Sequence, residues 1–225
     1  MLTVLTALIV VVSACGSAEP NSAATSASTT TAAETIVEGT ERAAFDRDPI
    51  SVPMALYVVT ETGDPSSPLS SQRTEQDLAG IAEQMSEIWS QADIDLEVVN
   101  IETIEAPSDV LDAIAFGRDT DPFFNQVGAT FDVPNPGLIN GFYVRSAGGV
   151  NGFAPLGSRV FFVVDEPSVL DQRVSSHEVG HIFALHHQVL DPNTLMFSGT
   201  NGLRLEPIEQ EVARYAAQGV LDGQR

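Results

Sequence analysis

The sequence of 225 residues contains no lysine and a single cysteine, Cys15. One thiol excludes an internal disulfide and every metal site built from several thiolates. The ten basic residues are all arginines, and they stand against 31 aspartates and glutamates, so the formal net charge is -21. Because phosphate binding needs clustered basic side chains, we expect no nucleic-acid partner and no direct binding to an anionic membrane surface.

The first 15 residues have the pattern of a secretory signal. Residues 2–12 are apolar over a length that is too short to span a bilayer but typical of the hydrophobic segment of a signal peptide. Residues 12–15, Val-Ser-Ala-Cys, resemble a bacterial lipobox, in which the cysteine is acylated and becomes the new N-terminus. We therefore expect an exported protein, lipid-anchored through Cys15 on the outer side of the bacterial cell membrane, or secreted if Cys15 is not acylated.

The composition then changes along the chain. Residues 16–49 begin with a stretch of Ser, Thr and Ala that has too little bulky apolar surface to offset the entropy of ordering. We interpret them as a flexible tether and lead-in. Hydrophobic residues make up 43% of the whole chain, which is enough for a core. We expect one folded domain over residues 50–225.

The folded part begins with a strand–helix–strand pattern. Residues 54–59 are a continuous apolar run of strand length. Residues 78–89 carry apolar side chains at helical spacing, with Ser71 or Thr74 as the candidate N-cap. Residues 94–98 alternate between apolar and acidic, which is typical of a half-buried strand. This order predicts a right-handed parallel βαβ unit.

Shorter elements are predicted further along the chain. The pattern favours a short helix at 108–116, a loop rich in Gly, Pro and Asp up to about residue 137, and strands at 138–145 and 159–164. A helix is predicted to begin around Ser168 or Asp171 and to carry the histidines described next.

All four histidines lie within eleven residues, and the first two form the motif His-Glu-x-x-His at positions 177–181. Residues four apart share one face of a helix, so His177 and His181 can reach the same ion. Glu178 is not placed to bind that ion and is instead a candidate for taking a proton from a metal-bound water. The motif therefore indicates a zinc-dependent hydrolase.

A zinc site of this kind needs a third protein ligand. If the helix continued, the next residue on the metal-facing side would be Leu185, which cannot bind a metal. His186 and His187 would lie about 140° and 240° around the helix from His181. Neither reaches the ion from an unbroken helix, so we expect the helix to end near Phe183 and the chain to turn back.

Residues 177–187 resemble the extended metzincin pattern HExxHxxGxxH, with His177, His181 and His187 at the three ligand positions. Residues 191–196 resemble the Met-turn of the matrixin branch, which would place Met196 beneath the ligands. The resemblance implies one catalytic zinc ion bound by three histidines and a water.

The resemblance also implies a fold class. We expect an α+β domain of the metzincin-like zincin type, with a twisted mixed β-sheet and two long helices, the second of which carries HExxH. A Met-turn and a C-terminal helix, at residues 206–218, would follow. The resemblance spans about residues 50–220, although specific motifs occur only within 177–196.

Two positions depart from the family pattern. Ala184 stands where the family has a glycine that permits a left-handed turn, and a side chain there costs about 1–2 kcal/mol. This leaves open a turn of different shape in which His186 replaces His187. Ser198 stands two residues after Met196, where some metzincin branches have an additional tyrosine ligand.

The chemistry that this site implies is peptide-bond hydrolysis. Zinc bound to neutral imidazoles lowers the pKa of its water, and Glu178 would take that proton and deliver it to the leaving amine. We expect a peptide or protein substrate and a monomeric enzyme that contacts the membrane only through its lipid anchor. Residues 151–158 are a candidate edge for pairing with an extended substrate, with an ordinary loop as the alternative.

A second cation is a weaker hypothesis. Calcium takes oxygen ligands, and an acidic loop offers three aspartates that could bind it, although solvated carboxylates explain them as well. These residues are Asp119, Asp121 and Asp132.

Two other functions remain open from the sequence. In a gluzincin-type hydrolase the third ligand is a downstream glutamate, for which Glu206 and Glu209 are the candidates. Alternatively, the chain is a non-catalytic lipoprotein that binds a partner at the surface. Retention of Glu178 beside the histidines disfavours this last interpretation, because a pure binding protein has no need for a proton-transfer group.

Overall fold

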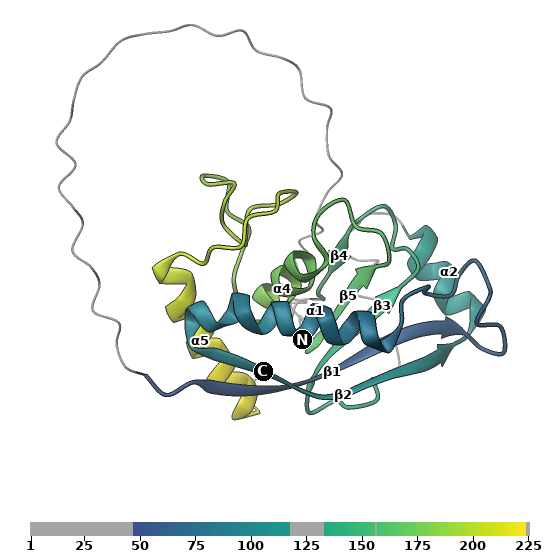
Figure 1. Cartoon of the computed structure of the whole chain (residues 1–225), viewed down its shortest axis with the longest axis horizontal. Helices are drawn as coiled ribbons and strands as arrows, with labels where there is room; N and C mark the ends of the chain where they lie inside the picture. The colour runs from purple at the N-terminus through teal and green to yellow at the C-terminus, as the bar shows by residue number, and fades with distance from the viewer. Residues whose placement is uncertain (1–46, 118–132, 156, 224–225) are drawn as a thin grey trace, which may run out of the picture.

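The computed structural model describes residues 47–117, 133–155 and 157–223. Within these residues the chain has a mixed α/β fold with a five-stranded sheet and four α-helices (Figure 1). None of the helices in this part of the chain is both long enough and apolar enough to cross a membrane.

Several predictions from the sequence lie outside the described residues. They are the signal segment with Cys15, nearly all of the tether, and the three aspartates proposed for calcium, Asp119, Asp121 and Asp132.

The predicted βαβ unit is confirmed. Strand β1 (Ile50–Glu61) and strand β2 (Ile94–Ala106) pair in parallel, and helix α1 (Glu75–Trp89) connects them, followed by a single 3-10 turn, η1 (Ser90–Ala92). Of the two candidate N-caps, Thr74 is the one used. Its hydroxyl accepts from the backbone N–H of the third helical residue, whose carboxylate in turn accepts from the Thr74 N–H.

The other strands extend the sheet on the side of β1 opposite β2. Strand β3 (Ile139–Val144) lies parallel to β1, and β5 (Val160–Val164) lies parallel to β3, so both predicted strands are confirmed. The two-residue strand β4 (Gly152–Phe153) pairs antiparallel with β5 and ends the sheet, whose order is β2-β1-β3-β5-β4. Of the proposed edge segment, residues 151–158, only Gly152 and Phe153 lie in a strand among the described residues.

The three other helices are α2 (Ser108–Phe116), α4 (Asp171–Ile182) and α5 (Pro207–Leu221). The alternation of side chains along β1 divides the core in two. Apolar residues of α1, α4 and α5 pack on one face of the sheet, and those of α2 pack on the other. Figure 1 shows α5 and α2 at opposite ends of the molecule.

Two ion pairs of Arg73 connect the end of β5 to the start of α4. Asp165, just after β5, accepts hydrogen bonds from the Ser71 hydroxyl at 2.6 Å and lies 3.8 Å from Arg73 Nε. Arg73 also donates to a carboxylate oxygen of Asp171, the first residue of α4, at 2.6 Å. The loop before α1 is thereby joined to the end of β5 and to the beginning of the histidine-bearing helix.

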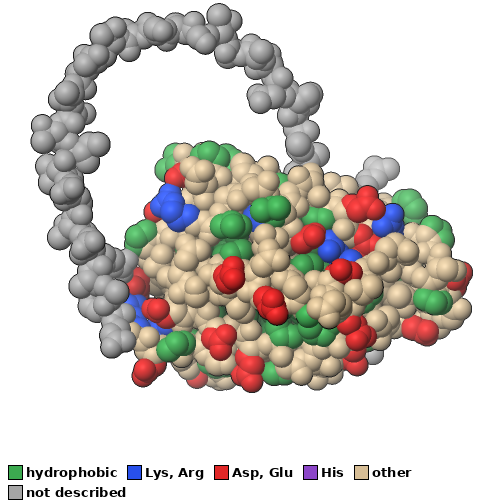
Figure 2. Space-filling model, in the orientation of Figure 1, with side chains coloured by type: hydrophobic (Ala, Val, Ile, Leu, Met, Phe, Trp, Pro, Cys, Tyr) green, Lys and Arg blue, Asp and Glu red, His purple; other side chains and the backbone are tan. Residues whose placement is uncertain are grey.

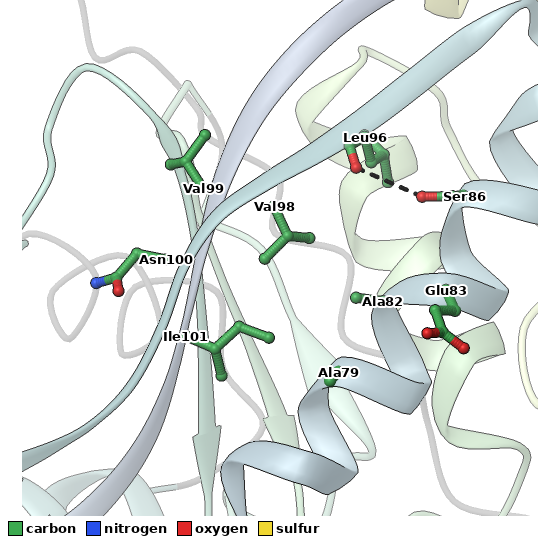
Figure 3. Close-up of a pocket in the computed structure, with 9 residues that line it drawn as sticks. All are labelled: Ala79, Ala82, Glu83, Ser86, Leu96, Val98, Val99, Asn100 and Ile101. Carbon is green, nitrogen blue, oxygen red and sulfur yellow. Dashed lines mark hydrogen bonds between the residues drawn. The ribbon is translucent and has the colours of Figure 1, made fainter.

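The far edge of the sheet carries a shallow groove of about 400 Å³ between α1 and β2. Met54 pairs with Val98 and Ala55 pairs with Asn100, so Val99 is an extra residue that forms a β-bulge. Figure 3 shows Val98 on the side of α1 and Val99 turned away from it. Because β2 and β4 are opposite edges of the sheet, this groove is separate from any site near β4.

Charged side chains are dispersed over the face of the molecule shown in Figure 2. Acidic side chains are scattered across the face shown in Figure 2, with several arginines among them. The formal net charge of -21 favours solubility and carries no information on fold.

Close packing at the centre of the sheet leads us to expect that position 141 requires a glycine. Gly141 lies between Leu56 and Phe161 on the neighbouring strands, and an added Cβ would lie 2.8 Å from Leu56 Cδ2 and still closer to the Phe161 ring. We expect Gly141→Ala to lower the free energy of unfolding by about 1–3 kcal/mol through overpacking, measured by chemical denaturation. Gly137→Ala is the control, because an added Cβ there would meet no atom within 4 Å. Equal stability of the two variants would contradict this account of the core.

Candidate metal centre

Helix α4 places two histidines and a glutamate in the interior. His177 and His181 lie one turn apart, and their ring centroids are separated by 4.8 Å. His177 and Glu178 are fully buried, and His181 is 8% exposed. The helix is buried along almost its whole length, although most of its residues are polar.

The helix ends where the histidine pattern required it to end. Its last residue is Ile182, Phe183 is the C-cap, and Ala184 adopts a left-handed conformation with φ of +63°. The N–H of Ala184 donates to the His181 carbonyl at 3.1 Å, and the N–H of Leu185 donates to the Gly180 carbonyl at 2.8 Å. These two bonds define a Schellman motif, formed here with an alanine in the usual place of glycine.

The reversed chain brings a third histidine back to the first two. His187 Nε2 lies 2.9 Å from His177 Nε2 and 3.2 Å from His181 Nε2. His186, the alternative third ligand, is exposed. Among the described residues, the three converging histidines form the only group of this size whose side chains could share a metal ion.

Backbone carbonyls orient two of the rings. His177 Nδ1 lies 2.7 Å from the Leu195 carbonyl, and His181 Nδ1 lies 2.9 Å from the Leu185 carbonyl. Because a carbonyl oxygen can only accept, the Nδ1 atoms carry the protons. The Nε2 atoms of the neutral rings therefore direct their lone pairs toward the centre of the group.

Burial keeps these imidazoles neutral. Loss of solvation lowers the pKa of His177 well below its ordinary value and lowers the pKa of His181 to about 4. The pKa of His187 is lowered as well, first by burial and then by the positive charge of Arg173. Neutral imidazole is the form that binds a metal, so the site is ready for a cation near neutral pH.

The geometry fits zinc. Nitrogen ligands about 2.0–2.1 Å from a tetrahedral zinc ion lie about 3.3 Å from one another. The two Nε2 separations of 2.9 and 3.2 Å approach this value. The Nε2 lone pairs of His177 and His181 face His187 Nε2, and three neutral imidazoles suit zinc.

Met196 packs directly beneath the histidine helix. An added Cβ on Gly180 would lie 2.6 Å from Met196 Sδ, so the glycine between the two histidines is what allows this close approach. The Met196 carbonyl accepts from the Gln188 N–H at 3.1 Å, which joins this turn to the residue that follows His187. The requirement for a glycine at 180 was not recognised from the sequence.

Arg173 is a second residue that the sequence analysis missed. It is buried one turn before His177, and its Nη2 donates to the Leu195 carbonyl at 2.9 Å and also to the Phe197 carbonyl. It therefore holds the backbone on both sides of Met196. The sequence carries no signal for it, because an arginine in a helix is ordinarily expected at the surface and its burial follows only from the packing of α4.

Strand β4 lies against the same helix beside Glu178. An added Cβ on Gly152 would lie 3.2 Å from Glu178 Cγ and 2.8 Å from Val174 Cγ1. The absence of a side chain at Gly152 thus lets the edge strand approach α4 next to the glutamate.

The two glutamates of the gluzincin alternative have a different role. Glu206 and Glu209 form a capping box at the start of α5, in which a Glu209 carboxylate oxygen accepts from the Glu206 N–H at 2.7 Å. Neither belongs to the histidine group.

Among known proteins, only solved structures match this chain, and the likeness is in fold only. No family model matches the chain, and no curated protein matches it. Among 71 matching chains of solved structures is archaemetzincin from Methanopyrus kandleri, at 15% identity and a TM-score of 0.49, over 75% of this chain and 96% of that one. Metalloproteinase-II from Bacteroides fragilis gives 12% identity and a TM-score of 0.48, over 75% and 53%.

A chain in the structure of a chaperone–substrate complex has a TM-score of 0.52 at 16% identity. The alignment covers 77% of the present chain but only 35% of that chain. At such identities the matches concern architecture alone, so the chemistry of the site has to be argued from its own residues.

Ala184 provides a test of the helix end. A left-handed alanine is strained by about 1–2 kcal/mol, whereas glycine adopts this conformation freely. We expect Ala184→Gly to raise the free energy of unfolding by about 1 kcal/mol, measured with a chelator present so that metal binding does not contribute. The same change at Ala79, inside α1, should lower it by about 1 kcal/mol. Loss of stability at both positions would be inconsistent with the turn described here.

The adjacent histidines give a matched pair of variants. We expect His187→Ala to weaken zinc binding by more than about 100-fold, since changes to outer-shell partners alone weaken metal binding by about 10- to 100-fold. His186→Ala should leave the affinity unchanged, because that ring is exposed. The measurement is competition with a chromogenic zinc chelator. If His186→Ala had the larger effect, the third ligand would have been assigned to the wrong histidine.

Proposed function

We propose that the protein is a zinc-dependent endopeptidase of the metzincin type, with His177, His181 and His187 as the zinc ligands and Glu178 as the general base and acid. The observation that carries the proposal is the convergence of the three histidines, with His187 Nε2 at 2.9 Å from His177 Nε2 and 3.2 Å from His181 Nε2, beside a glutamate buried on the helix of the first two. The matrixin-like Met-turn, with Met196 beneath Gly180, is part of this proposal.

Zinc bound at this site would polarise the scissile carbonyl and lower the pKa of a water molecule. The remaining chemistry is assigned to Glu178. A buried carboxylate next to the histidines can accept a proton from the attacking water and return it to the leaving amine. The fixed Nδ1–carbonyl contacts of His177 and His181 keep the ligand nitrogens in place while the proton moves.

An extended peptide is the substrate form that the edge of the sheet favours. Strand β4 is the last in the sheet order, so within the described residues its outer edge has no neighbouring strand. Gly152 brings that edge close to Glu178. A peptide added alongside β4 by backbone hydrogen bonds would therefore pass the histidine group.

The place of action is proposed from the sequence alone. The signal segment and Cys15 support export and a lipid anchor, and residues 16–49 would tether a single catalytic domain, 50–225, to the membrane surface. We propose that the enzyme works as a monomer on peptides or proteins outside the cell.

The decisive test separates zinc binding from proton transfer. We expect Glu178→Gln to reduce cleavage of a peptide library by about 10²- to 10⁴-fold while the zinc content stays at one ion per chain. The amide keeps the shape of the side chain but cannot accept the proton.

Glu206→Gln is the control, because that residue caps α5 and is not part of the histidine group. It should retain both zinc and activity, whereas the gluzincin alternative predicts loss of zinc. A wild-type protein that binds zinc but cleaves no peptide would favour the non-catalytic lipoprotein and refute the proposed activity.

A further inference from the structure

Helix α1 and strand β2 belong to a stretch of the chain that carries charge of one sign. No arginine occurs between Arg73 and Arg118, and the chain has no lysine, so the ionised side chains of this stretch are all acidic. Each arginine that the structure describes already donates a hydrogen bond within its own chain. None of these arginines forms an ion pair with an acidic residue of α1 or β2. This part of the surface therefore offers its negative charge to an external cation.

The groove of about 400 Å³ between α1 and β2 combines an apolar lining with an acidic rim. Figure 3 shows Ala82 facing Val98 across the groove, with the Glu83 carboxylate beside it. The alanines of α1 leave the space open because they have no side chain beyond Cβ. Glu83 is exposed, and Glu87, which is also exposed, lies one turn further along the same face of the helix. The apolar lining consists of Ala79, Ala82, Leu96, Val98, Val99 and Ile101.

Two features restrict the pairing of β2 with a further strand, although β2 is the last strand in the sheet order. The bulge at Val99 interrupts the regular register. The N–H of Thr103 already donates to a Glu75 carboxylate oxygen at 3.0 Å. Bulges and charged side chains are both devices that protect an edge strand. A partner in this groove is therefore held by its side chains rather than by an added strand.

Charge decides which partner fits. A second copy of the domain would bring the same acidic surface to the contact, so like charges disfavour self-association through this face. Nucleic acid and anionic membrane are disfavoured for the same reason. The lower part of the face in Figure 2, where Figure 1 places α1 and β2, shows acidic and apolar side chains side by side. Long basic side chains match both, because they bury an apolar stem and keep a charged head in water.

We propose that this groove binds arginine and lysine side chains from a basic segment of another polypeptide. Their stems pack against Ala79, Val98 and Ile101, and their charged heads lie beside Glu83 and Glu87. The groove lies at the edge of the sheet opposite β4, so a polypeptide bound here leaves the histidine group free. The inference does not depend on the proposed peptidase activity.

The test measures binding directly. The probe is a short peptide of alternating arginine and serine with a rhodamine label, followed by fluorescence anisotropy at low ionic strength. Every sample carries Glu178→Gln so that the probe is not cut. We expect Glu83→Arg to weaken binding by about fivefold or more, because an attraction is replaced by a repulsion. Ala79→Leu fills the groove without changing the charge and should weaken binding by about threefold or more through lost contact with the stems.

Asp112→Arg is the matched control, because it makes the same change of charge at an exposed position of α2, which packs on the other face of the sheet. It should leave the affinity within about twofold. Equal weakening by Glu83→Arg and Asp112→Arg would indicate general attraction to an acidic protein and would overturn the proposal. Unchanged binding by Ala79→Leu, or no binding of the probe by the parent protein, would overturn it as well. A wild-type protein without peptidase activity would refute the proposed function but would leave this result unchanged.

Discussion

The site depends on one turn of backbone, the left-handed reversal at Ala184. If the helix continued, the third histidine would lie on the wrong side of it. The reversal closes two hydrogen bonds, to the His181 and Gly180 carbonyls, and returns His187 to within 3.2 Å of His181. The same turn supplies the Leu185 carbonyl that orients the His181 ring. The end of the helix and the orientation of the His181 ring therefore depend on the same turn. This explains why a strained alanine is tolerated at position 184.

Much of this arrangement could be predicted from local pattern. The parallel βαβ unit followed from a buried apolar run, an amphipathic helix capped by Thr74 and an alternating strand, each of which is specified by neighbouring residues. The end of α4 near Phe183 followed from helical geometry applied to the histidine positions. In both cases the decisive information lies within a few residues of the feature.

The features that escaped prediction involve residues far apart in sequence. Position 180 requires a glycine because Met196 lies against it, and position 152 requires a glycine because Glu178 and Val174 lie against it. Arg173 donates hydrogen bonds to two backbone carbonyls that are more than 20 residues away in sequence. A single sequence shows a glycine or an arginine but not the atoms that approach it, so contacts of this type become visible only after packing is known.

Arg173 unites the electrostatics and the architecture of the site. Burial is the main cause of the lowered pKa of all three histidines, and the positive charge of the buried Arg173 lowers these pKa values further, which favours the neutral imidazole. Arg173 also donates to the Leu195 carbonyl, the atom that orients His177 through its Nδ1. One side chain thus holds the turn that carries Met196 and the acceptor of a ligand ring. Without this side chain, the Leu195 and Phe197 carbonyls would lose the guanidinium donor and the imidazoles would lose one of the charges that disfavour their protonation, so the fold of the turn and the state of the imidazoles both depend in part on Arg173.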